Sequence, residues 1–169
     1  MRNKNKQSSG FTLIELLVVI AIIGLLSSLA LIATMQARQK ARDAKRLGDM
    51  TQMNNALELY FSTYKGYPSI TSNGVPVADR NSIVTIPTAP MPPDGTCIGM
   101  PHSAACIADD PNCSGVPANT YYYITSGTAY LAPDGVTQVY PDYLYYFCLG
   151  NQTGNFAGGE RILTPRGMR

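Results

Sequence analysis

The chain has 169 residues, of which 45% are hydrophobic and 14% are charged, and its formal net charge is +2. This length predicts one compact domain, and charges so few and so evenly balanced exclude a basic nucleic-acid-binding domain. All twelve prolines and all four cysteines lie at or beyond residue 68. The sequence therefore divides into a helix-friendly N-terminal third and a turn-rich remainder.

The charges are unevenly placed along the chain. Three cations lie in the first ten residues, and five lie in residues 38–46 against a single acid. Residues 47–169 hold five basic and nine acidic side chains, a balance of −4. Cations therefore flank the apolar run 11–37, and we expect residues 38–46 to form a solvated basic stretch.

The apolar run from Phe11 to Ala37 contains Glu15 as its only charged residue. About 20 apolar residues span a bilayer as a helix, so this run is long enough to cross a membrane. Three interpretations are open: an ordinary signal peptide cleaved after Ala30, an ordinary membrane anchor, or a cleaved leader followed by an assembly helix. The first two leave the carboxylate unexplained, and an acid at membrane depth indicates a function by default.

The stretch from Gly10 to Gly24, which reads GFTLIELLVVIAIIG, resembles the class III signal of type IV pilins and type II secretion pseudopilins. The resemblance implies that residues 1–10 are a leader peptide, that a prepilin peptidase cuts between Gly10 and Phe11, and that the Phe11 amine is then methylated. It also implies that Glu15 supports filament assembly. Cleavage exposes an α-amino group that is mostly cationic at neutral pH, and Glu15 of the same chain or of a neighbour can pair with it.

The same resemblance implies a location and partners. The chain would cross the bacterial cytoplasmic (inner) membrane once, with its C-terminal domain outside the cytoplasm, and would join a filament on assembly. Its partners would be copies of itself or related pilins, the prepilin peptidase and methyltransferase, and the inner-membrane assembly machinery. No feature points to nucleic acid. The sequence does not distinguish a surface pilus, a DNA-uptake pilus and a secretion pseudopilus.

Helical periodicity continues beyond the membrane run, over residues 38–66. No proline interrupts the chain before Pro68, so we expect one helix of about 54 residues that ends near Lys65. The words ALELYF and GYP near this end are similar to the helix end of major pseudopilins. One amphipathic face should pack on the C-terminal domain; it comprises Ala37, Ala41, Ala44, Leu47, Met50, Asn54, Leu57, Phe61 and Tyr64.

Residues 67–169 predict a small antiparallel β-sheet packed on the helix, so the expected fold class is α+β. Turn signals separate strands expected at 121–125, 128–132, 136–140 and 143–149, joined in sequence as a meander. Residues 69–118 predict long loops with one short strand at 83–86. A sheet this small needs the helix behind it to form a core.

The four cysteines, Cys97, Cys106, Cys113 and Cys148, all lie in this C-terminal domain. No pair has the CxxC spacing typical of zinc sites, and four cysteines in an exported domain predict two disulfides. Three pairings are open. We favour Cys97–Cys106 with Cys113–Cys148, because the second bond would staple the long loops to the last predicted strand.

No catalytic or metal-binding pattern stands out. His102 is the only histidine and has no partner pattern, so we predict a protein that is not an enzyme. Asp109-Asp110 and Asp134-Gly135 could offer oxygens to calcium, which major pseudopilins bind in this region, but turn formation is the expected role and no cofactor or metal is expected. The leading hypothesis is a structural filament subunit. The alternative is an exported, disulfide-bonded binding domain released by ordinary signal peptidase after Ala30.

Overall fold

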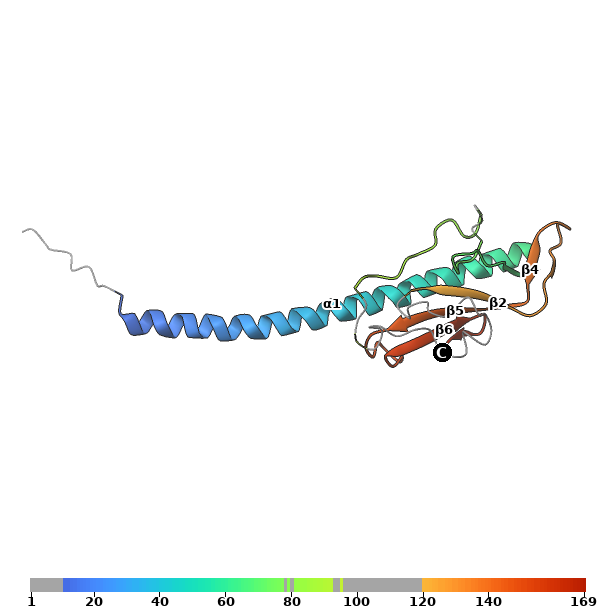
Figure 1. The fold of residues 1–169 in the computed structure, drawn as a ribbon. Coiled ribbons are helices and arrows are strands. Elements are labelled where there is room, and N and C mark those ends of the chain that lie inside the picture. Colours follow the sequence, from blue (N-terminus) through green and yellow to red (C-terminus); the bar gives the residue numbers. More distant parts are fainter. Residues whose placement is uncertain (1–10, 78, 80, 93–94, 96–119) are drawn as a thin grey trace, which may run out of the picture. The chain divides into compact units, whose positions relative to one another are not determined.

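The computed structural model describes residues 11–77, 79, 81–92, 95 and 120–169. The chain divides between Arg38 and Gln39 into an N-terminal part and a body, which are described separately. Figure 1 shows the helix and the labelled strands along the chain. The helix α1 (Leu13–Tyr64) has residues in both. The strands described in the body are β1 (Tyr67–Pro68), β2 (Tyr122–Ser126), β3 (Tyr130–Leu131), β4 (Gln138–Tyr140), β5 (Asp142–Leu149), β6 (Gly159–Thr164) and β7 (Gly167–Met168).

The N-terminal part is an exposed apolar helix. Every residue from Phe11 to Arg38 is exposed. Among the described residues, α1 is the one helix long and apolar enough to cross a membrane. The predicted long apolar helix is therefore confirmed.

The C-terminal end of α1 lies where the sequence predicts it. Lys65 has a φ of 58°, in the left-handed region, and its N–H donates to the Phe61 carbonyl at 2.8 Å. This is the usual conformation of a residue that ends a helix. Gly66 follows in close contact with β4, because a Cβ there would lie 2.5 Å from Val139 Cγ2. The chain therefore turns into β1 at a position that only glycine can occupy without rearrangement.

The strands form two antiparallel sheets, with the orders β1-β4-β3 and β2-β5-β6-β7. The predicted α+β class is confirmed. The predicted meander is right for β3 and β4, which pair with each other, and wrong for β2 and β5. β2 pairs with β5, with Tyr122 opposite Tyr146 and Ser126 opposite Asp142, and does not pair with β3. Both residues of β3 are exposed, whereas β5 buries side chains on both of its faces. Because β2 is itself largely buried, pairing with the buried β5 gives its side chains more packing contacts than pairing with the exposed β3 would.

Two further differences concern the ends of the predicted sheet. β6 and β7 are not among the predicted strands, because the sequence from 151 to 160 is rich in glycine and polar residues and hides the start of β6. The strand predicted at 83–86 is wrong. Ile83 makes an isolated bridge with Asp79, and its side chain is only 1% exposed, so it anchors a loop in the core without extending a sheet.

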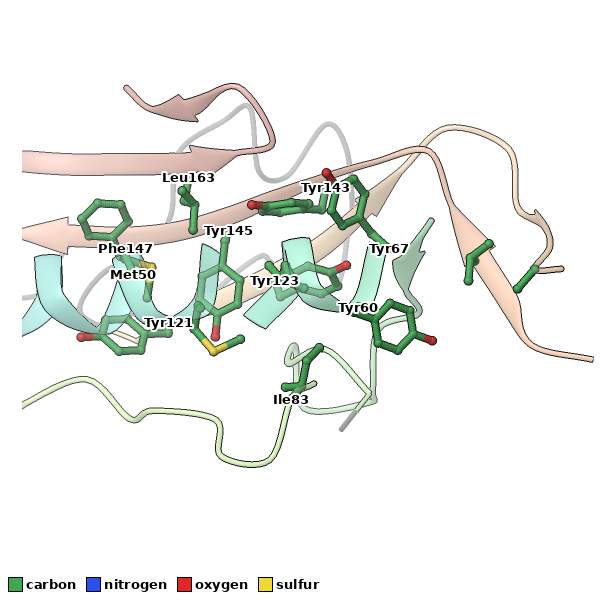
Figure 2. Packing of buried hydrophobic residues seen from close by; sticks show 14 of the residues in the cluster. Met50, Tyr60, Tyr67, Ile83, Tyr121, Tyr123, Tyr143, Tyr145, Phe147 and Leu163 are labelled. Carbon is green, nitrogen blue, oxygen red and sulfur yellow. The ribbon is translucent and has the colours of Figure 1, made fainter. Parts of the chain in front are cut away.

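The core of the body lies between α1 and one face of the four-stranded sheet (Figure 2). Side chains alternate across a strand, so Tyr143, Tyr145 and Phe147 of β5 share the face toward the helix. The helix contributes methionine, leucine and tyrosine side chains to the same cluster. Its fully or nearly buried members include Met50, Met53, Leu57, Tyr60, Tyr67, Ile83, Tyr121, Tyr123, Val139, Tyr143, Tyr145, Phe147, Leu149 and Leu163.

Tyrosines dominate this core, and several of their hydroxyls donate to polar partners within it or at its edge. Tyr123 Oη donates to the Pro68 carbonyl at 2.8 Å, and Tyr123 stacks on Tyr143 with ring centroids 5.7 Å apart. Burial raises the pKa of Tyr60 to about 12, because the anion would lose its hydration. Tyrosine suits a core of this kind because its ring packs as an apolar surface while its hydroxyl can be satisfied by a single hydrogen-bond partner.

A glycine in the loop after β1 provides a test of this packing. Gly74 has a φ of +70°, and a Cβ there would lie 2.1 Å from Cε2 of the buried Tyr122. We expect Gly74→Ala to lower the free energy of unfolding by about 2 kcal/mol or more, since backbone strain and overpacking add. Gly135 is the matched control for strain alone, because its φ is +72° and a Cβ added there would meet no atom within 4 Å. Denaturant titration of the full chain in detergent would contradict this account if Gly74→Ala and Gly135→Ala cost the same.

Candidate functional site

Two groups of polar side chains stand out against these apolar surfaces, and the first lies at the start of α1. Thr12 Oγ1 accepts from the Glu15 N–H at 3.3 Å, while Glu15 Oε2 accepts from the Thr12 N–H at 2.9 Å. The Thr12 hydroxyl also donates to Glu15 Oε2 at 2.7 Å. This reciprocal arrangement is a capping box, which satisfies helix N–H groups that have no partner within the helix.

The geometry leaves one oxygen of Glu15 available. Both bonds from Thr12 end on Oε2, and among the described residues Oε1 accepts no hydrogen bond. An ionised carboxylate offers about four acceptor positions, so Oε1 can accept from a further donor without breaking the cap. The apolar side chains beside it line a shallow groove with Glu15; they are Phe11, Ile14, Val18 and Val19.

The predicted cleavage site is only partly within the described residues. Gly10 lies outside them, and Phe11 is 76% exposed. The assignment of Gly10 and Phe11 to cleavage, of Phe11 to methylation and of Glu15 to assembly therefore stays a prediction. In the structure, Glu15 lies one helical turn after Phe11 and accepts hydrogen bonds from Thr12. This position is close enough to the N-terminus of the helix for Glu15 to pair with an amine there.

The second group is a buried ion pair in the body, between Asp43 and Arg46 of α1. Arg46 Nη1 and Asp43 Oδ1 are 2.7 Å apart, and both side chains are fully buried. The Asp43 carboxylate also accepts the N–H groups of Gly150 at 2.9 Å and Asn151 at 3.0 Å. Arg46 Nη2 donates to the Pro90 carbonyl at 3.2 Å. The pair therefore ties α1 to the turn after β5 and to the loop before residue 92.

This pair corrects two expectations about residues 38–46. Arg46 is not part of a solvated stretch, and the amphipathic face does not begin at Ala37, Ala41 and Ala44, which are all exposed. The buried face begins instead with Asp43 and Arg46. The i, i+3 spacing of Asp43 and Arg46 is the only indication of this ion pair in the sequence. The N–H groups that donate to Asp43 lie more than 100 residues away, so no local pattern reveals them.

A buried ion pair contributes less to stability than its geometry suggests, because both charges lose hydration. Here the lost hydration is replaced by the hydrogen bond within the pair and by three hydrogen bonds to backbone groups, two of them to consecutive N–H groups. The arrangement requires the turn after β5 to lie at one place along the helix. Its role is therefore to set the register of the body on its own helix.

The other predicted site residues are mostly outside the described chain. Cys148 is fully buried in β5, whereas Cys97, Cys106 and Cys113 lie outside the described residues, so the predicted pairing stays a prediction. His102 and Asp109-Asp110 also lie outside them. Within the described ranges, no group of three or more histidine, cysteine, aspartate or glutamate side chains could hold a metal.

Asp134, the other residue considered for calcium, is engaged in its own turn. Its Oδ1 accepts from the N–H groups of Val136 and Thr137, both at 2.9 Å, and these bonds lower the pKa of the Asp134 carboxyl together with a bond from the Thr137 hydroxyl, which has the largest effect. Turn formation was the expected role of this residue. Calcium binding stays untested.

Adjacent cations on α1 allow the buried pair to be tested. Arg46→Met would leave the Asp43 carboxylate buried without its counterion, so we expect the free energy of unfolding to fall by about 3–5 kcal/mol. Lys45→Met changes a neighbouring exposed cation in the same way and should alter stability by no more than about 0.5 kcal/mol. Denaturant titrations of both full-length variants in detergent give the comparison. Equal stability of Arg46→Met and the parent chain would show that the pair does not hold the body together.

Comparisons with known proteins agree with the features at the start of α1. Residues 5–31 match the family described as the prokaryotic N-terminal methylation motif. The chain is 40% identical over 90 residues to the type II secretion system core protein G of Escherichia coli K12, covering 53% of this chain and 57% of that protein. It is 36% identical over 86 residues to the core protein G of Aeromonas hydrophila, covering 51% and 56%.

A third relative is the core protein G of Vibrio cholerae, which is 34% identical over 89 residues, with 53% of this chain and 57% of that protein covered. The matched stretch thus spans little more than half the length of each of these relatives. No solved structure matches the chain. The methylation motif and these similarities confirm the predicted resemblance of this chain to the pilin-like and pseudopilin family.

Proposed function

We propose that this chain is a structural subunit of a type IV pilus-like or type II secretion pseudopilus filament. The observation that carries the proposal is the N-terminal methylation motif at residues 5–31, which leads directly into an exposed apolar helix. Three curated relatives named type II secretion system core protein G favour the pseudopilus. A structural subunit of this kind needs no active site. It needs helix surfaces that pack against neighbouring subunits and an interaction that fixes the axial register of these helices.

Processing by a prepilin peptidase would prepare the helix for assembly. A cut between Gly10 and Phe11 removes the three cations of the leader and creates a free α-amino group on Phe11. That amine is mostly cationic at neutral pH, and methylation leaves it basic. The new charge would lie one helical turn from Glu15, whose Oε1 atom is available to it or to the amine of a neighbouring chain.

Assembly would exchange lipid for other copies of the same helix. This exchange yields little hydrophobic free energy, because lipid tails are as apolar as leucine. Packing of the exposed side chains from Phe11 to Ala37 would supply the attraction, and the pair between Glu15 and an amine would fix the axial register. Before assembly, the chain would cross the bacterial inner membrane once, with its body outside the cytoplasm. Its partners would be related pilins, the prepilin peptidase and the membrane assembly machinery.

We also propose that two disulfides staple the body. Cys148 is fully buried in β5, and each of its three potential partners precedes β2 in the chain. A bond from β5 to that segment would close a long loop, which restricts the unfolded chain more than it restricts the folded one. The pairing we favour is Cys113–Cys148 with Cys97–Cys106.

Mass spectrometry of the mature N-terminus tests the processing step. We expect the chain, expressed with a prepilin peptidase, to begin at N-methylated Phe11. A chain that begins at Leu31 would identify the alternative, an exported domain released by ordinary signal peptidase. Retention of Met1 would contradict both interpretations.

Removing the charge of Glu15 tests the assembly step. Glu15→Gln keeps the shape of the side chain and should still be processed, but we expect at least a tenfold loss of filaments because no carboxylate meets the neighbouring amine. Ser28→Ala, which removes an exposed hydroxyl that donates to the Leu25 carbonyl of its own helix, is the control and should assemble normally. Sheared filaments from cells with a type II secretion apparatus give the measurement. Normal yield from Glu15→Gln would rule out the charge pair.

Peptide mapping of the non-reduced protein tests the disulfides. We expect one cross-linked peptide that joins Cys113 to Cys148 and a second that joins Cys97 to Cys106. Recovery of four free thiols from protein exported to an oxidising compartment would overturn both bonds. A bond from Cys148 to Cys97 or Cys106 would overturn only the pairing.

A further inference from the structure

The hairpin formed by β3 and β4 presents apolar side chains to solvent around an ordered turn. Leu131 is 63% exposed and Val136 is 83% exposed, so neither side chain belongs to the core of the body. The Asp134 carboxylate holds the turn between them, because it accepts the N–H groups of Val136 and Thr137, both at 2.9 Å. Asp134 is also the only charged residue of the hairpin. Residues 131–136, the hairpin tip, therefore form an anionic and partly apolar surface of fixed shape.

A second surface without a partner lies at the start of the body, on α1. Lys40, Ala41, Ala44 and Lys45 are all exposed, and among the described residues neither lysine makes an ion pair. At 3.6 residues per turn the two lysines lie about 140° apart, and the two alanines fall between them on the half of the helix away from Asp43. Because alanine side chains are short, another surface can come close to the helix between the two cations. We call these four residues the basic helix face.

One chain cannot bring these two surfaces together. The hairpin is fixed at the C-terminal end of α1, where the Tyr130 hydroxyl donates to the Lys65 carbonyl. From Ala44 to Lys65 the helix rises about 32 Å, whereas the four residues from Tyr130 to Asp134 reach at most about 14 Å. The hairpin tip of a chain is thus too far from its own basic helix face, and any contact between them joins two copies.

The two surfaces are complementary in charge. The hairpin tip carries one anion and no cation, while the basic helix face carries two cations, and the acid between them in sequence, Asp43, is fully buried against Arg46. A contact between two different surfaces of identical chains is heterologous, and its repetition produces an open helical filament unless the rotation closes a ring. This property fits the proposed filament, whereas a contact between two like surfaces would stop at a dimer.

We propose that the hairpin tip of one copy docks on the basic helix face of a second copy, with Asp134 beside Lys40 and Lys45. The inference rests on the proposed filament, to which it adds a contact between bodies. Leu131 and Val136 would be covered by the alanine side of the helix, and the opposite charges would select this register over others.

Photocrosslinking tests where the hairpin tip docks. Val136 is replaced by p-benzoylphenylalanine in the full-length chain, sheared filaments are irradiated, and peptide mass spectrometry locates the cross-link. We expect a cross-link to residues 40–45 of another copy. The same probe at Leu59 is the control and should give no such cross-link, because Leu59 is 51% exposed on α1 but lies about 22 Å of helix rise beyond Ala44. Equal cross-linking from both positions, or a Val136 probe that reaches a different protein, another part of the chain or nothing, would overturn the proposal.

Charge reversal with rescue tests the role of the two lysines. Lys40→Glu/Lys45→Glu should lower the yield of sheared filaments by about tenfold, since three acids would then face one another. Adding Val136→Lys to this variant should recover most of the lost yield, because the hairpin tip then offers a cation to the new acids. Arg166→Glu/Arg169→Glu reverses two exposed cations near the C-terminus and should assemble as the parent chain does. Normal yield from the lysine variant, or a loss that Val136→Lys does not reduce, would contradict the proposed contact.

The parent chain separates failure of this contact from failure of the proposed function. If it forms filaments in which position 136 does not cross-link to residues 40–45, only the contact is overturned. If the processed parent chain forms no filaments with the assembly machinery present, the contact and the proposed function fail together.

Discussion

Water is a poor solvent for the surface that α1 exposes between Phe11 and Ala37, and the proposed role of the protein depends on this constraint. Burial of one leucine, isoleucine or valine side chain is worth about 1.5–3 kcal/mol, and most residues of this segment are apolar while all of them are exposed. Such a surface needs lipid or other apolar helices around it. Both environments make the lone carboxylate of Glu15 costly unless it has partners, and the capping box with Thr12 provides them on one oxygen only.

The constraint on the body is different, because one face of its part of α1 is buried in the core of a small domain. Methionine, leucine and tyrosine side chains of the helix meet an aromatic face of the four-stranded sheet, where the ring of Tyr123 contacts those of Tyr143 and Tyr145. Apolar contacts of this kind tolerate sliding along the helix axis. The bonds from Asp43 to the N–H groups of Gly150 and Asn151 do not, since they require one register. Because Asp43 is buried in this pair, no acidic side chain offsets the exposed cations of the neighbouring turns, and the surface of the helix there is basic.

The sequence predicts well what depends on local pattern. The helix runs to Tyr64 as the periodicity indicates, and β2, β4 and β5 lie within two residues of their expected positions. The meander correctly predicted that β3 pairs with β4, but nothing near β2 reveals that it joins β5, because this pairing depends on a distant partner. For the same reason the charge pattern around Asp43 and Arg46 predicted a solvated stretch, while the N–H groups that bury Asp43 come from residues 150 and 151. The motif around Glu15 is local and was recognised from sequence, but the choice of Oε2 by both Thr12 donors required coordinates.

The central claim is that the apolar face of α1 exchanges lipid for other copies of itself. Photolabelling with a lipid-soluble diazirine, mapped by peptide mass spectrometry, measures this directly in two states of the same protein. In vesicles, we expect residues between Phe11 and Ala37 to be labelled. In sheared filaments exposed to the same reagent, the labelling of this segment should largely disappear while the body is unchanged. Equal labelling of the segment in both states, or none in vesicles, would contradict the account.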